Sequence, residues 1–175
     1  ITNISGAHFK NFNTLKDIAK AKAEIINNIS KDGNIILNRD SKFFSLLSNK
    51  GKKNGIKITS FSLKKKSDIF LLGIKKIKKR FRLRINIRNK IFFFDTKYTT
   101  DNFVNNILAC ISTMFALNLN LNKMKKIFTS FKIPEGRGDV KIIKKFNKKF
   151  KFIDESYNAN PLSMMSAIKN MSYYN

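Results

Sequence analysis

The order of motifs in residues 133–164 constrains the fold most strongly. A Pro-Glu-Gly-Arg-Gly turn places Arg137 between two glycines. A short apolar run then ends in Asp154 and Glu155, and the polar loop Ser-Tyr-Asn-Ala-Asn-Pro leads into a helix-like stretch. This order predicts a strand whose C-terminal end carries acids and amides into a crevice, where open α/β sheets bind their ligands. An ordinary strand–loop–helix connection produces the same pattern, and composition alone favours that simpler interpretation.

Arg137 is the candidate anion-binding residue of this stretch. Flexible glycines on both sides allow its side chain to swing towards a phosphate and bind it as a fork.

The net charge of +25 over 175 residues has two interpretations. Clustered cations indicate a nucleic-acid-binding protein, because they neutralise phosphates and release counterions. Lysines that are spread over solvated faces affect only solubility and non-specific binding. The lysines extend from Lys10 to Lys169 without a recognisable nucleic-acid module, which favours the second interpretation. The same charge would suit a substrate that carries a diphosphate and several carboxylates.

The single cysteine, Cys110, excludes an internal disulfide framework and is compatible with a reducing compartment. No apolar run approaches the roughly 18 residues of a membrane span, and the first residues do not resemble a signal peptide. We therefore expect a cytoplasmic protein. The chain begins with Ile1 and stops soon after a helix begins, so we also expect it to be a piece of a longer protein.

The first part of the chain alternates helix and strand signals. Thr14 and Asp17 form a capping-box start, and apolar residues then recur at helical spacing as far as Ile29. The pattern predicts strands at residues 34–38 and 56–61, a short helix at 41–47 and a basic glycine loop at 50–55. The loop lacks the spacing of a Walker P-loop.

Residues 80–88 alternate arginine or asparagine with Phe81, Leu83, Ile85 and Ile87. This pattern predicts a half-buried antiparallel strand with one basic face. The basic face is either an anion-binding surface or an ordinary solvated one. The solvated interpretation is favoured, because the sequence shows no interleaved exposed aromatic residues.

A long helix is predicted from Asp101, capped by Thr100 or Asp101, with Cys110 in its apolar stripe. Asn102 and Asn105 lie one turn apart at its start. A further helix is predicted at residues 119–131. A hairpin with Asn147 in its turn is predicted from the apolar runs at 140–143 and 150–153.

The Gly-Arg-Gly turn, the acidic pair and the Ser-Tyr-Asn-Ala-Asn-Pro loop together resemble the Mur ligase family, and one branch of it in particular. His8, Lys22, the Asn-x-x-Asn pair at 102–105 and the residues from Asp32 to Asp40 also fall on family motif positions. Asp101 stands where the family has a histidine, and Glu155 stands where it usually has an aspartate.

The resemblance implies an α/β fold in two parts. Residues 1–133 would form the second half of a central ATP-binding domain, a mostly parallel sheet with helices and a small antiparallel β region. Residues 134–175 would begin a Rossmann-like C-terminal domain.

The resemblance also implies an ATP-dependent, ADP-forming amide ligase of peptidoglycan precursor synthesis, and so of cell wall biogenesis, cell shape and cell division. It would join D-Ala-D-Ala to UDP-MurNAc-tripeptide through an acyl phosphate. The resemblance further implies a monomer with no specific nucleic-acid partner. Because the P-loop would lie upstream of Ile1, we expect these 175 residues alone to have no ligase activity.

Site residues follow from the same resemblance. His8 and a carbamylated Lys22 would bind Mg²⁺ and, with Arg137, form the catalytic set. The nucleotide would be bound by Asn102, Asn105, Arg137 and Glu155. The substrate would be bound by Ser156, Tyr157, Asn158 and Asn160.

Two alternatives stay open. The first is another ligase of the same superfamily, of the folylpolyglutamate synthase type. The second is a basic nucleic-acid-binding module.

Overall fold

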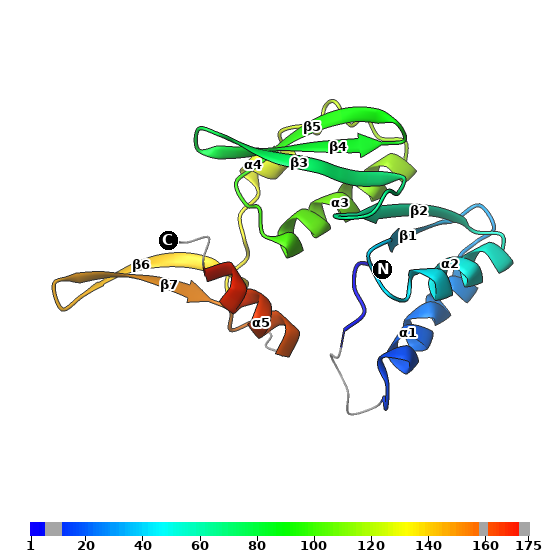
Figure 1. Cartoon of the computed structure of the whole chain (residues 1–175), viewed down its shortest axis with the longest axis horizontal. Coiled ribbons are helices and arrows are strands. Elements are labelled where there is room, and N and C mark those ends of the chain that lie inside the picture. The colour runs from blue at the N-terminus through cyan, green and yellow to red at the C-terminus, as the bar shows by residue number, and fades with distance from the viewer. Residues whose placement is uncertain (6–11, 158–160, 172–175) are drawn as a thin grey trace. The chain divides into compact units, whose positions relative to one another are not determined.

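The computed structural model describes residues 1–5, 12–157 and 161–171, which form two compact units. The first unit contains the described residues up to Ser130, and the second contains those from Phe131 onwards. His8, Asn158 and Asn160 lie outside the described residues. Figure 1 shows the elements of both units.

The N-terminal part of the first unit alternates helices and strands. As predicted, Thr14 caps the first helix: its Oγ1 accepts a hydrogen bond from the N–H of Asp17, and Asp17 reciprocates. The elements are α1 (Leu15–Ala23), the 3₁₀ helix η2 (Glu24–Asn28), β1 (Asn34–Asn38), α2 (Phe44–Lys53) and β2 (Lys57–Ser62).

The remaining strands of the first unit are β3 (Ile69–Ile77), β4 (Arg80–Ile87) and β5 (Lys90–Thr96). The five strands form one sheet in the order β1-β2-β3-β4-β5 (Figure 1). The β1–β2 and β2–β3 pairs are parallel, whereas β3–β4 and β4–β5 are antiparallel. The predicted α/β class with an antiparallel region is confirmed.

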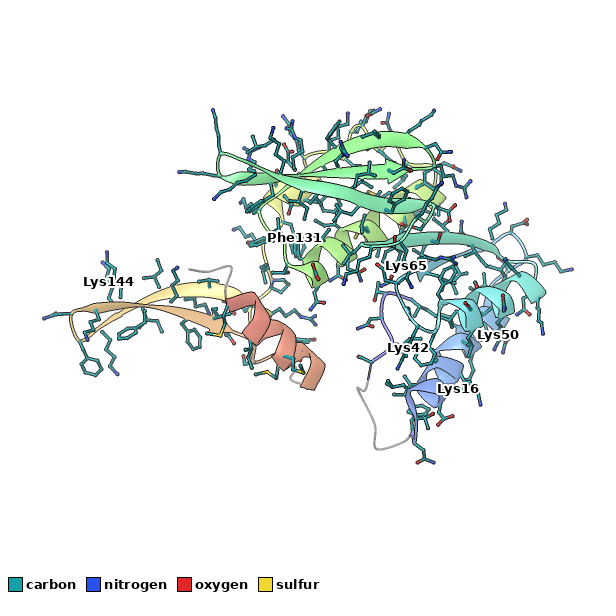
Figure 2. All side chains as sticks on the ribbon, in the orientation of Figure 1. Lys16, Lys42, Lys50, Lys65, Phe131 and Lys144 are labelled. Atoms are coloured by element: carbon teal, nitrogen blue, oxygen red, sulfur yellow. The ribbon has the colours of Figure 1, made fainter. Side chains whose placement is uncertain are left out.

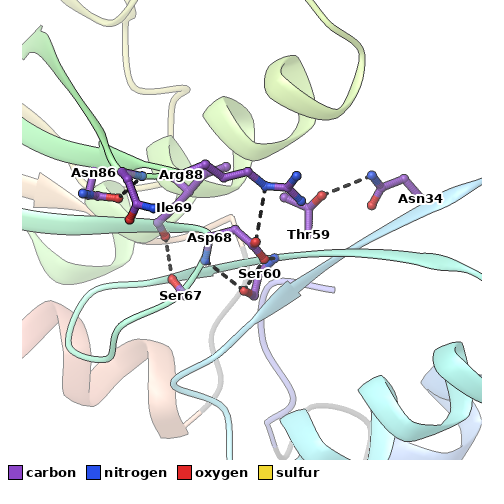
Figure 3. Close-up of polar contacts among 9 residues, drawn as sticks. Asn34, Thr59, Ser60, Ser67, Asp68, Ile69, Asn86 and Arg88 are labelled. Atoms are coloured by element: carbon purple, nitrogen blue, oxygen red, sulfur yellow. Dashed lines mark hydrogen bonds and ion pairs between the residues drawn. The ribbon is translucent and has the colours of Figure 1, made fainter.

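A small polar network lies where the sheet changes from parallel to antiparallel pairing (Figure 3). The backbone N–H and the Oγ of Ser60 donate to Asp68 Oδ2 at 2.9 and 2.6 Å. Arg88 Nε lies 3.4 Å from the other carboxylate oxygen of Asp68. One side chain therefore links β2 to the segment that follows β4.

The long helix α3 (Asp101–Ala116) forms the main core of the first unit with the sheet. Val104, Leu108 and Ile111 are buried on α3, and Leu83 and Phe94 are buried on β4 and β5. A second core cluster joins α1, η2 and α2 to β1. The alternation predicted for β4 is confirmed, since Leu83, Ile85 and Ile87 are buried while its arginines are exposed.

Three local predictions were wrong. Residues 50–53 belong to helix α2 rather than to a loop, because Gly51 is buried in the helix close to Ile58. Cys110 is exposed rather than in the core, since the buried face of α3 follows Val104 and Leu108. The helix predicted at 119–131 is reduced to α4 (Ile127–Ser130), preceded by turns.

The second unit contains the hairpin of β6 (Asp139–Lys145) and β7 (Lys148–Asp154), followed by α5 (Pro161–Asn170). Phe146 and Asn147 form its two-residue turn, with φ angles of 53° and 56°. Such positive φ values at both positions are typical of a type I′ turn, whose twist matches that of the strands. The predicted hairpin and the place of Asn147 in its turn are confirmed.

Within the described residues, no helix is long and apolar enough to cross a membrane.

Leu83→Ala should lower the free energy of unfolding by about 2–5 kcal/mol, because Leu83 is fully buried and a cavity would remain in the core. Leu117→Ala is the matched control, since Leu117 is 65% exposed and should change stability by less than about 0.5 kcal/mol. Urea unfolding followed by circular dichroism measures both values. Equal losses in the two variants would contradict the packing described here.

Candidate functional site

The first candidate site is a crevice where β1 and β2 end and α3 begins. It has a volume of about 320 Å³. The carboxyl ends of parallel strands and the N-terminus of a helix meet here, an arrangement that commonly binds ligands in α/β proteins. The lining residues are Asn3, Asn38, Asp40, Leu63, Lys64, Lys65, Asp101, Asn102 and Asn105.

Asn38, the last residue of β1, fixes the orientation of an amide in this crevice. Its Nδ2 donates to Asn105 Oδ1 at 3.2 Å and to the carbonyl oxygen of Thr2 at 3.1 Å. Its Oδ1 accepts from the N–H of Asp40 at 2.8 Å. Because the oxygen of Asn105 is thus engaged, its Nδ2 group is left to donate to a ligand.

Asp40 shapes the other wall of the crevice. Its Oδ2 accepts hydrogen bonds from the N–H groups of Leu63 and Lys64, at 2.6 and 3.3 Å, which fixes the loop after β2. Its Oδ1 is buried without a hydrogen-bond partner among the described residues. Buried polar atoms normally have a hydrogen-bond partner, so this oxygen can accept a hydrogen bond from a donor group of a ligand.

The start of α3 contributes the predicted amides. Thr100 caps the helix through Phe103 N–H at 3.4 Å, and Asn102 and Asn105 both line the crevice. The N-terminus of a helix attracts negative charge, but Asp101 in the first turn opposes it. The arrangement therefore suits hydrogen bonding to a polar ring better than direct binding of a phosphate.

Lys22 is exposed on α1 and does not line this crevice. The backbone nitrogen of Ile1 donates to the Ile36 carbonyl oxygen of β1 at 2.7 Å. Lys22 lies within electrostatic reach of Ile1. His8, the predicted partner of Lys22, lies outside the described residues. The described part of the chain contains no group of three His, Cys, Asp or Glu side chains that could hold a metal.

The second candidate site lies within the second unit, around the Gly-Arg-Gly turn. The guanidinium of Arg137 stacks on the ring of Tyr157, 4.0 Å from its centroid. The N–H of Tyr157 donates to the Gly136 carbonyl at 3.0 Å, and the N–H of Gly138 donates to the Asp154 carbonyl at 2.6 Å. The structure therefore joins the predicted turn to the start of the predicted polar loop.

The contact between the Gly-Arg-Gly turn and Tyr157 requires a glycine on each side of Arg137. Gly136 and Gly138 have φ angles of 72° and 90°, which side chains rarely tolerate. A Cβ on Gly136 would also lie 2.9 Å from the Tyr157 nitrogen. The glycines therefore hold the turn against the loop, and Arg137 rests on Tyr157 rather than swinging freely.

Three acids gather beside the turn, and two of them titrate in opposite directions. The Oγ and N–H of Ser156 donate to Asp154 Oδ1 at 2.6 and 3.0 Å and lower the pKa of Asp154. Burial, and then the charges of Asp154 and Asp139, raise the pKa of Glu155. Asp139 also accepts a hydrogen bond from Gly136 N–H at 2.8 Å.

Asn38 and Asp40 were not among the predicted site residues. The signal for them was present, since an amide and an acid directly follow a buried strand. The structure brings together Asn102 and Asn105 in the first unit, and Arg137, Glu155, Ser156 and Tyr157 in the second.

A sequence profile described as the Mur ligase middle domain matches residues 1–114 of this chain. The chain is 34% identical over 171 residues to the UDP-N-acetylmuramoyl-tripeptide–D-alanyl-D-alanine ligase of Buchnera aphidicola subsp. Baizongia pistaciae. It is 31% identical to the enzyme of the same name from Rickettsia prowazekii. Both matches cover 97% of this chain but only 36% and 37% of the relatives, so the chain spans about a third of their length.

Solved structures of Mur ligases also match this chain. A crystal structure of MurF from Acinetobacter baumannii matches 100% of this chain and 37% of its own, with 26% identity and a TM-score of 0.85. The structure of MurF ligase from Thermotoga maritima in complex with ADP shares the fold, with a TM-score of 0.76 and 21% identity. The match covers 95% of this chain and 37% of the Thermotoga chain.

The opposite pKa shifts predict opposite effects of pH on stability. Because the folded state raises the pKa of Glu155, its contribution is fully present below the usual pKa of 4.5 and is lost as pH rises through the raised pKa. Asp154 contributes above its usual pKa of 3.8, and that contribution is lost as pH falls through its lowered pKa.

NMR titration of the side-chain carboxyl carbons should show the midpoint of Glu155 above 4.5 and that of Asp154 below 3.8. Ser156→Ala should move the Asp154 midpoint upwards, because the hydroxyl donor to Asp154 is lost and only the backbone N–H donor stays, while Glu155 keeps the sign of its shift. Glu155→Gln should remove the decline in unfolding free energy above pH 4.5. A Glu155 midpoint below 4.5 would contradict this account.

Proposed function

This chain belongs to the Mur ligase family through its middle domain, and we propose that it forms part of an ATP-dependent ligase of peptidoglycan precursor synthesis. The proposed substrates are UDP-N-acetylmuramoyl-tripeptide and D-alanyl-D-alanine, after the name of the curated relatives. The observation that carries the proposal is the amide-lined crevice at the strand ends, in a chain that aligns with those ligases over 97% of its length.

The proposed reaction has two steps. The terminal carboxylate of the tripeptide attacks the γ-phosphate of ATP, which gives an acyl phosphate and ADP. The dipeptide amine then attacks the acyl carbon, phosphate leaves, and the amine loses its proton. Such chemistry depends mainly on positioning the reactants and on neutralising charge.

The crevice of the first unit is proposed to hold the adenine. The ring nitrogens of adenine accept hydrogen bonds. The Nδ2 of Asn105 is a donor, and its orientation is fixed by the hydrogen bond from Asn38. Asn102 lies one helical turn away and lines the same crevice. The family resemblance implies the adenine contact, and the hydrogen-bond pattern gives it a physical basis.

The turn of the second unit is proposed to meet the rest of the nucleotide and the substrate. The planar guanidinium of Arg137 would bind phosphate oxygens in a fork, with its face supported by Tyr157. Glu155 would accept hydrogen bonds from the ribose hydroxyls. Ser156, Tyr157, Asn158 and Asn160 are proposed to line the reacting centre.

His8 and a carbamylated Lys22 are the proposed magnesium ligands. An unmodified lysine is a cation with no acceptor, so Lys22 must carry the carbamate to become an oxygen ligand, which Mg²⁺ prefers. Lys22 is exposed, and its amine is thus accessible to carbon dioxide. When bound, the metal would neutralise charge between the γ-phosphate and the carboxylate.

The proposed enzyme is larger than these 175 residues. The chain spans about a third of the length of its curated relatives, and its sequence contains no P-loop. We therefore expect the 175 residues to show no ligase turnover by themselves.

The assay uses a protein extended upstream to include a P-loop. ADP release should require both the UDP-muramoyl tripeptide and D-alanyl-D-alanine, and mass spectrometry should find the joined product. Turnover with folate and glutamate instead would assign another ligase of the superfamily. Absence of ADP release with any acceptor would overturn the proposal.

Asn105→Ala should weaken binding of a fluorescent ATP analogue to that extended protein about tenfold, because the proposed hydrogen bond to the adenine is lost. Asn106→Ala is the matched control, since Asn106 follows on the same helix but is exposed and does not line the crevice. It should change affinity less than about twofold. Equal effects of the two substitutions would place the nucleotide elsewhere.

A further inference from the structure

Arginine is distributed very differently from lysine in this chain. Lysines are spread over both units, for example Lys16 on α1, Lys50 on α2 and Lys144 on β6 (Figure 2). Four of the six arginines lie within residues 80–88. Arginine binds phosphate as a planar fork, which lysine cannot do, so this concentration points to a specific anion rather than to general solubility.

Three of these arginines share the outer face of the sheet. Arg80, Arg82 and Arg84 alternate with the buried face of β4 and are exposed. Alternate residues of a strand lie about 6.6 Å apart, at roughly 3.3 Å per residue. Consecutive phosphates of an extended nucleic-acid strand are separated by a similar distance.

An exposed aromatic ring completes this face. Phe93 on β5 pairs directly with Arg84 and is 45% exposed. On the other side Arg84 pairs with Gly73, where even an added Cβ would meet no atom within 4 Å. Arg84 therefore lies between Phe93 and an open position at Gly73, and the exposed face of the Phe93 ring leaves room for a base to stack on it.

The surface continues into a cationic hollow at the β3–β4 end of the sheet. This cavity of about 510 Å³ is lined by Ile77, Lys78, Lys79, Arg80, Arg82 and Asp95. Asp95 holds Arg82 through two hydrogen bonds of 2.7 and 3.1 Å. Among the described residues the side chains of Arg80 and Arg84 form no hydrogen bond or ion pair, although Arg80 lies within electrostatic reach of Asp95. Both guanidinium groups can therefore bind an incoming phosphate.

We propose that the outer face of β3, β4 and β5 is a binding surface for single-stranded nucleic acid. Arg80 and Arg84 are four residues apart on β4, about 13 Å at roughly 3.3 Å per residue, so they bind two phosphates that have one further phosphate between them. Phe93 stacks with a base. The expected absence of exposed aromatic residues, which favoured an ordinary solvated face, does not hold at Phe93. This surface is separate from the amide-lined crevice, and the proposal does not depend on ligase activity.

The test measures fluorescence anisotropy of a labelled oligouridylate of about 12 nucleotides with the 175-residue chain, over roughly 50 to 300 mM KCl. Arg80→Ala/Arg84→Ala should weaken binding about fivefold or more and reduce the slope of log K against log salt by about 1.4, at about 0.7 per phosphate. Lys52→Ala/Lys53→Ala is the charge-matched control on α2, with both lysines exposed. Each double variant lowers the net charge from +25 by two, to +23.

Stacking is tested separately from charge. Phe93→Ala should weaken binding about fivefold or more, as loss of one stacked base does, whereas Phe146→Ala should change it less than twofold. Phe146 is 79% exposed on the β6–β7 hairpin and is the matched control. Circular dichroism checks that all four variants keep the fold.

Equal losses in the arginine and lysine double variants would reduce the binding to general electrostatics and overturn the proposal. Equal effects of Phe93→Ala and Phe146→Ala would overturn it as well. So would complete displacement of the oligonucleotide by an acidic protein at equal charge concentration, because that result would assign the surface to a protein partner.

Discussion

The burial of α3 against the sheet is the constraint on which the first unit depends. Val104, Leu108 and Ile111 are buried in the same cluster as Leu83 and Phe94. Each such side chain contributes about 1.5–3 kcal/mol when buried, so α3 cannot slide or rotate without a large loss. Its first turn is therefore held where β1 and β2 end, and the crevice follows from this packing.

The elements with strong periodicity could be predicted from the sequence. The alternation around Leu83 predicts a half-buried strand, and the capping box at Thr14 predicts the start of a helix. The structure contains both. Cys110 shows the limit of such patterns. Its spacing fits the apolar stripe of α3. The width of the buried face, however, depends on which elements pack against the helix, and Cys110 is exposed.

The candidate site was predictable in its residue types and less so in its contacts. Acids and amides after a strand indicated a ligand site at Asp154 and the loop after it. The Asn38–Asn105 hydrogen bond of the first crevice was not predicted, because it joins residues 67 positions apart, which no local pattern reveals. The same holds for Gly51. Glycine and lysine together suggested a loop, whereas close packing against Ile58 makes a small residue suitable inside a helix.

The hairpin of the second unit carries exposed apolar side chains, such as Ile142 and Phe150, on a sheet of two strands in the described chain. Unprotected strand edges of this kind tend to pair with other molecules. The lysines at 144, 145, 148 and 149 flank the hairpin tip and make copies repel each other. Because the screening length falls to about 3 Å near 1 M salt, this repulsion between copies weakens as the ionic strength rises.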